Sequence, residues 1–480
     1  MKNSKKILLL SLFFILFINI SAISAVDASN DNITSDINKN DEILPVQETD
    51  HDDLADKLSI KEENVLRASG SMSFDDLCDK VSKSSKVTLN SDVKFTSGDS
   101  SSGIFISKHR ETIIDGKGHT IDLKGKSDIF IIPTGYTLIL KNVNIKNAYN
   151  AKNPKGSILN SGTLKISHCN FTNCKSKTSG GVITGAGSTT VTHSSFNKCT
   201  AGVNAGAILA NGVVLKYCRF TDCSAKKMGG AVMGNKAKIH NCNFVRDVAG
   251  CGGAVAGKVY IYDSTFKNCK STKSKSSSSK TDGGGACSGE FPRVERCTFI
   301  GCKATNGGYG GALRGTTNTY NCKFVNCAAK EGGAIRGKGE TIGCTFEKCV
   351  STSSMGGAIF TEKTTISKCK FIGCSAKKSH GGAVYVGNNA KITNCKFTGC
   401  TASKGFGGAV YGNGVVVKCT FNKNKAKCGG AVGSYSLTVK SSTFTSNSAY
   451  KGGAAYNVKS IVSCKFSKNK ATYGNNVYRG

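Results

Sequence analysis

The hydrophobic positions of this chain recur in one fixed pattern. A typical unit is the segment 381–400, which begins with Gly-Gly-Ala-Val and continues with Ile392, Cys395, Phe397 and Cys400. Its phenylalanine occurs thirteen times, at gaps of 22 to 26 residues apart from one gap of 33, at positions 171, 196, 220, 244, 266, 299, 324, 346, 371, 397, 421, 444 and 466. Self-similarity at such a period predicts a solenoid of stacked turns.

Each unit predicts short strands that are separated by tight corners. The apolar segments are three to five residues long, and Gly, Asn, Ser and Lys lie between them. A turn of this length holds three short strands and three bends, and successive turns would stack about 4.8 Å apart as parallel sheets. The predicted fold is therefore all-β, a parallel β-helix that is right-handed like most parallel crossovers.

Side-chain alternation along a strand predicts which positions face inward. Cys395 and Phe397 lie two residues apart, so both are expected to point into the solenoid. The aligned phenylalanines are then expected to stack along its axis. The Gly-Gly pair predicts a corner where backbone crowds backbone or adopts a positive φ.

Composition divides the chain into four segments. Residues 1–25 have a basic start, an apolar run and small residues at the end, which predicts a signal peptide, with an uncleaved anchor as the alternative. Residues 26–70 are acidic and lack a periodic apolar pattern, which predicts a disordered linker. Residues 71–155 are interpreted as a cap with irregular first turns, and residues 156–480 as the regular repeats. No transmembrane segment is expected after signal cleavage.

A short helix and a surface loop are the two predicted departures from the repeat. Ser73 is the expected N-cap of a helix whose apolar stripe is Phe74, Leu77 and Val81. This helix is well placed to cover the open end of the first turn. The polar run 270–280 lies within the 33-residue gap and is interpreted as a surface loop, with contact to an acidic partner as the alternative.

The repeat motifs resemble those of known proteins. Gly429-Gly-Ala-Val432 together with Phe421-Asn-Lys-Asn424 resembles the polymorphic outer membrane protein repeat. Asp115-Gly-Lys-Gly-His-Thr-Ile-Asp122 looks like the opening of pectate-lyase-like β-helices. From about residue 70 to residue 480 the chain is similar to secreted adhesin-like proteins of methanogenic archaea. The resemblance implies a secreted or surface-exposed role in adhesion, and it is more specific for fold than for function.

Most of the 23 cysteines occupy two positions of the repeat. Ten lie two residues before a phenylalanine and nine lie three residues after one. Stacked turns bring like positions within the Cα separation that a disulfide needs, so disulfides are feasible in an exported protein. The alternative is two columns of buried thiols that act as small hydrophobic side chains. The Cys-x4-Cys spacing without a histidine column disfavours metal binding. The candidate disulfide or thiol columns contain Cys297, Cys322, Cys344, Cys369 and Cys395, and Cys302, Cys327, Cys349, Cys374 and Cys400.

Charge is distributed unevenly along the chain. The net charge is +34, 15 of the 31 acidic residues lie between Asp27 and Asp79, and none follows Glu362. One interpretation is a solvated lysine surface that prevents aggregation. The other is a surface for acidic polysaccharide, cell wall, or host or microbial surface glycans. Nucleic acid is not expected, because export removes the usual target and aromatic residues are sparse. The candidate polyanion-binding residues, expected to project from one edge of successive turns, are Lys377, Lys378, Lys404, Lys423, Lys425, Lys427, Lys451, Lys468 and Lys470.

Catalysis is the main alternative to binding, because β-helices include polysaccharide lyases and hydrolases. Glycoside hydrolysis needs paired carboxylates, and the acidic residues of the regular turns do not recur at one position. Asp115-Gly116 is interpreted as a turn, and Asp247, found where Cys or Asn is usual, as the end of a column. No catalytic residue, cofactor site or metal site is therefore assigned.

These observations predict an extracellular protein, secreted or associated with the cell surface. The expected function is that of a non-catalytic, adhesin-like β-helix. The alternatives are a secreted carbohydrate-active enzyme of the pectate-lyase-like fold and a structural filament of a surface layer.

Overall fold

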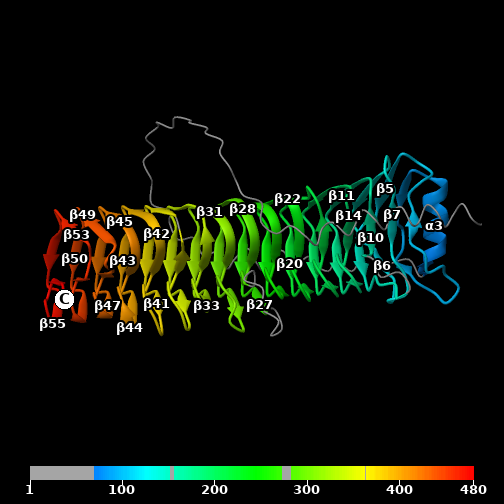
Figure 1. The fold of residues 1–480 in the computed structure, drawn as a ribbon. Coiled ribbons are helices and arrows are strands. Elements are labelled where there is room, and N and C mark those ends of the chain that lie inside the picture. The colour runs from blue at the N-terminus through cyan, green and yellow to red at the C-terminus, as the bar shows by residue number, and fades with distance from the viewer. Residues whose placement is uncertain (1–69, 152–155, 273–282, 363) are drawn as a thin grey trace, which may run out of the picture. The chain divides into compact units, whose positions relative to one another are not determined.

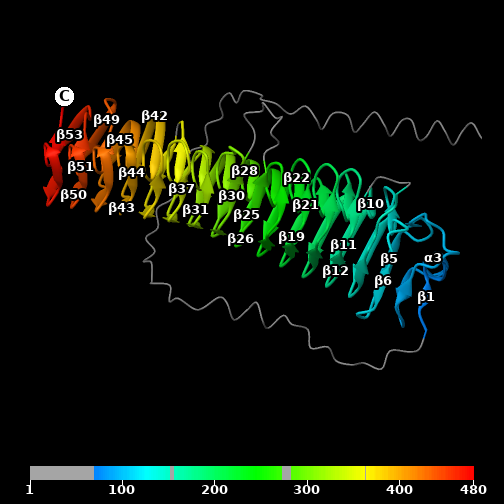
Figure 2. The same cartoon turned by 90° about the horizontal axis from the view of Figure 1, so that it is seen from below.

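A computed structural model of the chain describes residues 70–151, 156–272, 283–362 and 364–480. These residues form a right-handed parallel β-solenoid of about 16 turns (Figure 1 and Figure 2). The predicted fold class is confirmed. The predicted signal peptide, nearly all of the predicted linker and most of the polar run 270–280 lie outside the described residues.

The predicted helix is present as α3 (Phe74–Lys83), at the start of the solenoid in Figure 1. The Oγ of Ser73 accepts a hydrogen bond from the N–H of Asp76, and the Asp76 carboxylate accepts one from the N–H of Ser73. Phe74, Leu77 and Val81 are buried, as the apolar stripe predicts. The helix therefore covers the hydrophobic interior of the first turn.

Sheet A contains the strands that carry the phenylalanines, and all of its pairings are parallel. Its seventeen strands are β1 (Met72–Ser73), β3 (Val93–Lys94), β6 (Thr120–Asp122), β9 (Asn144–Lys146), β12 (Asn170–Thr172), β16 (Ser195–Asn197), β20 (Arg219–Thr221), β23 (Asn243–Val245), β26 (Thr265–Lys267), β29 (Thr298–Ile300), β32 (Lys323–Val325), β36 (Thr345–Glu347), β40 (Lys370–Ile372), β43 (Lys396–Thr398), β46 (Thr420–Asn422), β50 (Thr443–Thr445) and β54 (Lys465–Ser467).

Sheet B precedes sheet A within each turn, and in many turns a bend divides its strand into two. Its twenty-six strands are β2 (Lys86–Thr88), β4 (Ile104–Phe105), β5 (Glu111–Asp115), β7 (Phe130–Ile132), β8 (Thr137–Lys141), β10 (Ile158–Asn160), β11 (Thr163–Ser167), β14 (Ile183–Gly185), β15 (Ser188–Thr192), β18 (Ile208–Ala210), β19 (Val214–Lys216), β22 (Val232–His240), β25 (Val255–Tyr262), β28 (Cys287–Glu295), β31 (Leu313–Tyr320), β34 (Ile335–Lys338), β35 (Thr341–Ile342), β38 (Ile359–Thr361), β39 (Thr365–Ser367), β42 (Val384–Thr393), β45 (Val410–Val417), β48 (Val432–Gly433), β49 (Leu437–Lys440), β52 (Ala455–Tyr456), β53 (Ser460–Val462) and β56 (Val477–Tyr478).

Sheet C follows sheet A and leads to the Gly-Gly corner. Its thirteen strands are β13 (Lys175–Ser176), β17 (Thr200–Ala201), β21 (Ser224–Ala225), β24 (Val248–Ala249), β27 (Lys270–Thr272), β30 (Lys303–Thr305), β33 (Ala328–Ala329), β37 (Val350–Ser351), β41 (Ser375–Ala376), β44 (Thr401–Phe406), β47 (Lys425–Cys428), β51 (Ser448–Lys451) and β55 (Lys470–Tyr473).

Three corners with left-handed backbone join the sheets of a regular turn. In the turn that begins with β42, Asn394 has a φ of 54° between sheets B and A, and Gly399 has a φ of 64° between sheets A and C. Gly407, with a φ of 66°, begins the corner that returns to sheet B. Because these conformations recur from turn to turn, like positions stay in register along the solenoid.

The phenylalanines form a single internal column. Phe171 through Phe466 stack in twelve successive pairs, with ring centroids 4.7 to 5.1 Å apart. All of these rings except that of Phe466 are fully buried. The predicted inward orientation and aromatic stack are confirmed.

Candidate ligand-binding surface

Sheet C places lysines on both sides of a column of small residues. In β47, the exposed Lys425 and Lys427 flank the buried Ala426. In and after β13, Lys175 and Lys177 flank the buried Ser176 in the same way. The lysines that lie four or six residues after a phenylalanine are Lys175, Lys177, Lys226, Lys270, Lys303, Lys330, Lys377, Lys425, Lys427 and Lys470.

Acidic side chains are missing from these two positions. Across the thirteen turns, the positions four and six residues after each phenylalanine hold lysine or an uncharged residue, and never Asp or Glu. The small residue between them is Ala or Ser in every turn, and it is buried except at Ala449 and Ala471, which are partly exposed. Sheet C therefore presents a row of small residues bordered by positive charge, which an anionic polymer can approach closely.

The nine predicted lysines lie on or beside sheet C. Eight are exposed and Lys451 is partly exposed. Lys423 and Lys468 occupy the left-handed corner between sheets A and C, with φ of 55° and 54°. The other seven lie in sheet C strands or in the segments that connect these strands to the Gly-Gly corner.

The predicted succession of lysines from turn to turn is interrupted. Lys425 pairs with Thr401 on one side and with Ser448 on the other, and Ser448 pairs in turn with Lys470. Lys425 and Lys470 therefore share a column on alternate turns, about 10 Å apart. At this position a hydroxyl residue separates the like charges of alternate turns.

The sequence analysis missed lysines of the N-terminal turns. Lys175, Lys177 and Lys226 border a hollow of about 430 Å³ on sheet C, whose lining includes Ala201 and Ala225. The signal that would have found them is their shared distance from the phenylalanine, which is the same as that of Lys425 and Lys427.

The first column of candidate cysteines has a polar role at the corner between sheets B and A. The N–H of Cys297 donates to the Sγ of Cys322 at 3.3 Å, and the N–H of Cys322 donates to the Sγ of Cys344 at 3.4 Å. The N–H of Cys369 donates to the Sγ of Cys395 in the same way. Each side chain thus provides an acceptor for a backbone donor of the preceding turn.

The second column binds the preceding turn through the thiol hydrogens. The Sγ atoms donate to phenylalanine carbonyls of the preceding turn at 3.4 to 3.7 Å, in Cys302, Cys327, Cys349, Cys374 and Cys400. Asn424 and Asn447 replace cysteine in later turns, and their Nδ2 atoms donate to the equivalent carbonyls. The interpretation of these cysteines as small hydrophobic side chains omits this hydrogen bonding.

None of the described cysteines is joined to another by a disulfide bond in this structure. Burial raises the pKa of the Cys349 and Cys400 thiols well above its usual value. A protonated thiol is a poor nucleophile and a poor metal ligand. Among the described residues, no group of three or more His, Cys, Asp or Glu side chains is arranged to hold a metal ion.

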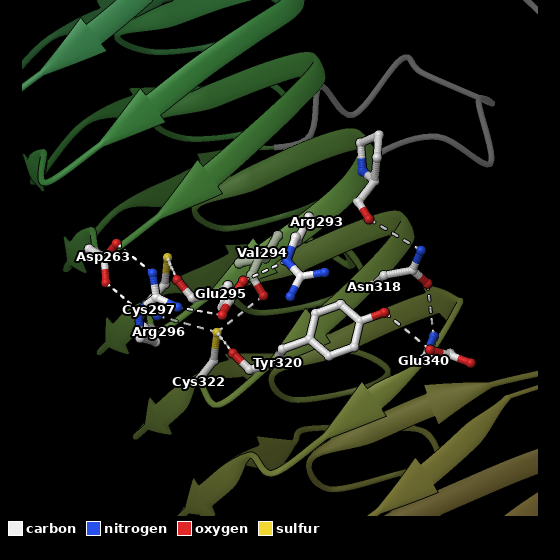
Figure 3. A network of polar contacts seen from close by, with 11 residues as sticks. Asp263, Arg293, Val294, Glu295, Arg296, Cys297, Asn318, Tyr320, Cys322 and Glu340 are labelled. Atoms are coloured by element: carbon white, nitrogen blue, oxygen red, sulfur yellow. Dashed lines mark hydrogen bonds and ion pairs between the residues drawn. The ribbon is translucent and has the colours of Figure 1, made fainter. Parts of the chain in front are cut away.

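A network of charged side chains links the turns around the longest repeat (Figure 3). Arg296 binds Asp263 of the preceding turn at 2.6 Å and also binds the neighbouring Glu295. Glu295 binds Arg293, whose guanidinium lies 4.7 Å from the ring centre of Tyr320 in the following turn. The Oη of Tyr320 donates to Glu340 at 3.1 Å. The network holds consecutive turns together on the outer surface, around the turn with the 33-residue spacing between phenylalanines.

The described carboxylates of the regular turns all have partners. Arg246 binds Asp222 at 2.7 Å, and the remaining ion pairs join Glu290 to Lys258, Glu331 to Arg336, Glu347 to Lys323 and Glu362 to Lys338. Near the N-terminus, the Oδ1 of Asp115 accepts from the N–H of Lys117, which confirms the predicted turn. These contacts do not present a pair of unpartnered carboxylates of the kind that glycoside hydrolysis uses.

Comparison with known proteins supports the fold. A family model described as a right-handed β-helix region matches residues 313–478. No curated protein and no solved structure matches the chain. In the part of the chain that the structure describes, no helix is long and apolar enough to cross a membrane. A right-handed β-helix is compatible both with a binding protein and with a polysaccharide-degrading enzyme.

Proposed function

We propose that this protein is an exported, non-catalytic β-helix that binds acidic polysaccharide in a cell wall or at a cell surface. The observation that carries the proposal is sheet C, where lysines flank a floor of small residues and acidic residues are absent from both flanking positions. A surface of one sign raises the local concentration of an oppositely charged polymer.

Charge screening determines how such a surface works. At physiological ionic strength the field of a lysine extends only about 8 Å, so a polymer must lie almost in contact with it. The small residues of sheet C allow this close approach. The predicted signal peptide of residues 1–25 supports export.

A charge-reversal experiment with a matched control tests the proposal. In the test variant Lys425, Lys427 and Lys470 on sheet C become Glu, and in the control variant Lys370, Lys396 and Lys465 on sheet A become Glu. Both variants change the net charge equally. Binding to polygalacturonate is then measured by calorimetry in low and in physiological salt.

The sheet C variant is expected to lose most of its affinity, whereas the sheet A variant loses little. Salt is expected to weaken binding of the unchanged protein. Equal losses in both variants would mean that only net charge matters, and unchanged binding in the sheet C variant would reject the proposed surface. Release of shorter sugar chains during the measurement would favour the enzyme instead.

A further inference from the structure

Aromatic side chains gather on the outer surface at the corner between sheets C and B. They come from two positions of the repeat. One is the residue immediately before the Gly-Gly pair, and the other lies two residues after the alanine that follows this pair. The aromatic strip is defined as Phe360, His380, Tyr385, Phe406, Tyr411 and Tyr456. All six residues are partly exposed, while the strand neighbours of Tyr385, Val384 and Val386, face the core.

The rings of the aromatic strip stack on one another from turn to turn. Phe360 and Tyr385 have ring centres 4.7 Å apart, and His380 lies 4.6 Å from Tyr411 and 4.8 Å from Phe406. Gly433 lies between Tyr411 and Tyr456 in the register of sheet B, so one ring is missing from this column. Phe406 spans the gap and stacks on Tyr456 at 5.5 Å.

This stacking determines which part of each ring a ligand can reach. The faces of the rings cover one another, and the residues are partly exposed, so the edges and the phenolic hydroxyls are the parts that a ligand can reach. Ring edges carry the positive end of the aromatic quadrupole, and tyrosine hydroxyls both donate and accept hydrogen bonds. A nucleobase needs a free ring face for stacking. The aromatic strip is therefore suited to anionic and hydroxyl groups rather than to bases.

Lysines lie directly beside the aromatic strip. Lys378 and Lys404 precede His380 and Phe406 by two residues each. In sheet C, Cys428 pairs with Phe406 on one side and with Lys451 on the other, so Lys451 lies two turns after Phe406 in the same column. No Asp or Glu side chain follows Glu362 in the sequence, so no carboxylate side chain of the C-terminal turns competes with an anionic ligand.

We propose that the aromatic strip and the lysines at positions 378, 404 and 451 form the sugar-recognising part of the binding surface. An acidic polysaccharide would lie along the axis of the solenoid, with its carboxylates against the lysines and its hydroxyls against the tyrosine hydroxyls. This inference rests on the proposed function and adds selectivity to it. Sheet C attracts any polyanion, whereas the aromatic strip distinguishes a sugar chain from other acidic polymers.

The test compares two acidic polymers, polygalacturonate and poly-L-glutamate, of which only the first is a polysaccharide, and single-stranded DNA serves as a third ligand. The full-length chain carries Tyr385→Ala, Tyr411→Ala and Tyr456→Ala together, and a second variant carries Phe at the same three positions. Tyr217→Ala is the control, because Tyr217 is exposed and stacks on His193 at a different corner. Circular dichroism and thermal melting establish that each variant is folded.

The triple Ala variant is expected to bind polygalacturonate at least about tenfold more weakly, because buried or stacked aromatic residues dominate recognition surfaces. Its affinity for poly-L-glutamate should change less than about twofold. The triple Phe variant, which keeps the rings, is expected to lose about threefold for polygalacturonate through its missing hydroxyls. It remains informative if the Ala variant does not fold.

Three results would overturn the inference. One is unchanged polygalacturonate binding in the triple variants, and another is an equal loss for both polymers. The third is a greater loss of single-stranded DNA binding than of polygalacturonate binding, which would identify a nucleic-acid surface. The charge-reversed sheet C variant separates the two proposals: if it keeps both affinities, the proposed function fails, whatever the tyrosine variants do.

Discussion

At the residue scale, Asp247 shows which hydrogen bonds are needed in the second cysteine column, three residues after each phenylalanine. The N–H of Cys400 donates to Oδ1 of Asn424, and Nδ2 of Asn424 donates to the Phe397 carbonyl. Asp247 holds the equivalent place, since its Oδ1 accepts from the N–H of Cys223 at 2.8 Å. Its buried Oδ2 corresponds to the amide nitrogen and has no hydrogen-bond partner among the described residues. We infer that the buried carboxyl is protonated, since only a protonated Oδ2 could donate a hydrogen bond as the amide nitrogen of Asn424 does.

The expectation that Asp247 ends its column is wrong. The column continues in the next turn, where the Sγ of Cys269 donates to the Phe244 carbonyl at 3.5 Å. Burial raises the pKa of Asp247 well above its ordinary value, and the nearby Asp222 raises it further. Arg246 acts in the opposite direction. Cys223 and Cys269, the neighbours in the column, are buried.

This assignment predicts how Asp247→Asn changes stability with pH. In the unfolded chain Asp247 ionises near pH 4, whereas in the folded state it stays neutral. A rise in pH therefore stabilises the unfolded state relative to the folded state. The parent protein should therefore lose stability relative to Asp247→Asn above about pH 4, by up to about 1.4 kcal/mol per pH unit, until the folded pKa is reached. Melting temperatures at pH 3, 5 and 8 measure this difference, which should be near zero at pH 3.

Asp222→Asn is the matched control in the preceding turn. Hydrogen bonding to Arg246 lowers the pKa of the Asp222 carboxyl. Its contribution to stability is present above the unfolded pKa and is lost as pH falls through the folded pKa. Because the pair is exposed, Asp222→Asn should lower stability by less than about 1 kcal/mol at pH 7 and by nothing at low pH. A pH-independent effect of Asp247→Asn would contradict the protonated state.

At the element scale, the two glycines of the corner have separate roles. Gly381 has a φ of 66°, and a Cβ there would lie 2.3 Å from the carbonyl oxygen of Val384 in its own turn. A Cβ on Gly382 would lie 2.0 Å from the carbonyl oxygen of Gly408 in the next turn. The first position accepts Ala205, whose φ is 55°. At the second position Asn475 is larger than glycine, but it belongs to the last turn that the structure describes, so no described turn lies against it. Contact with the following turn is therefore the stricter requirement.

This difference predicts unequal effects of two neighbouring substitutions. Gly381→Ala should cost about 1–2 kcal/mol, the usual cost of a left-handed residue with a Cβ, because Ala205 shows that the corner can accommodate a Cβ within its own turn. Gly382→Ala should cost about 3 kcal/mol or more, because the backbone of the next turn must move. Thermal unfolding of the two variants measures the difference. Equal destabilisation would mean that backbone conformation, and not the close contact, selects glycine at both positions.

The repeat made the fold predictable, but several features of its surface could not be predicted. Phe397, the Gly-Gly pair and the cap at Ser73 are local signals that recur or follow known capping rules, and the structure confirms them. The aromatic strip combines two positions whose residue types vary, and these become neighbours only after the corner has formed. The protonated state of Asp247 depends on its burial and on backbone groups of the preceding turn, such as the N–H of Cys223, which the sequence alone does not place beside it.

At the scale of the whole solenoid, the two ends differ in how they are held together. Asp and Glu side chains end at Glu362, so ion pairs with these side chains stabilise only the earlier turns. The later turns depend on the phenylalanine column and on polar contacts such as that between Asn424 and Asn447. Added salt should therefore weaken ligand binding at the basic turns while changing their stability little.

Stability should also be local, because each turn of a solenoid contacts only its neighbours. The helix α3 covers the first turn with the fully buried Leu77. Leu77→Ala should cost about 2–5 kcal/mol there and accelerate hydrogen exchange in β2 and β5, while leaving β46 and β50 unchanged. Phe421→Ala in β46 is the mirror control, which should accelerate exchange in β43, β46 and β50 while leaving β2 and β5 unchanged. Faster exchange along the whole solenoid in either variant would show that it unfolds as one cooperative unit.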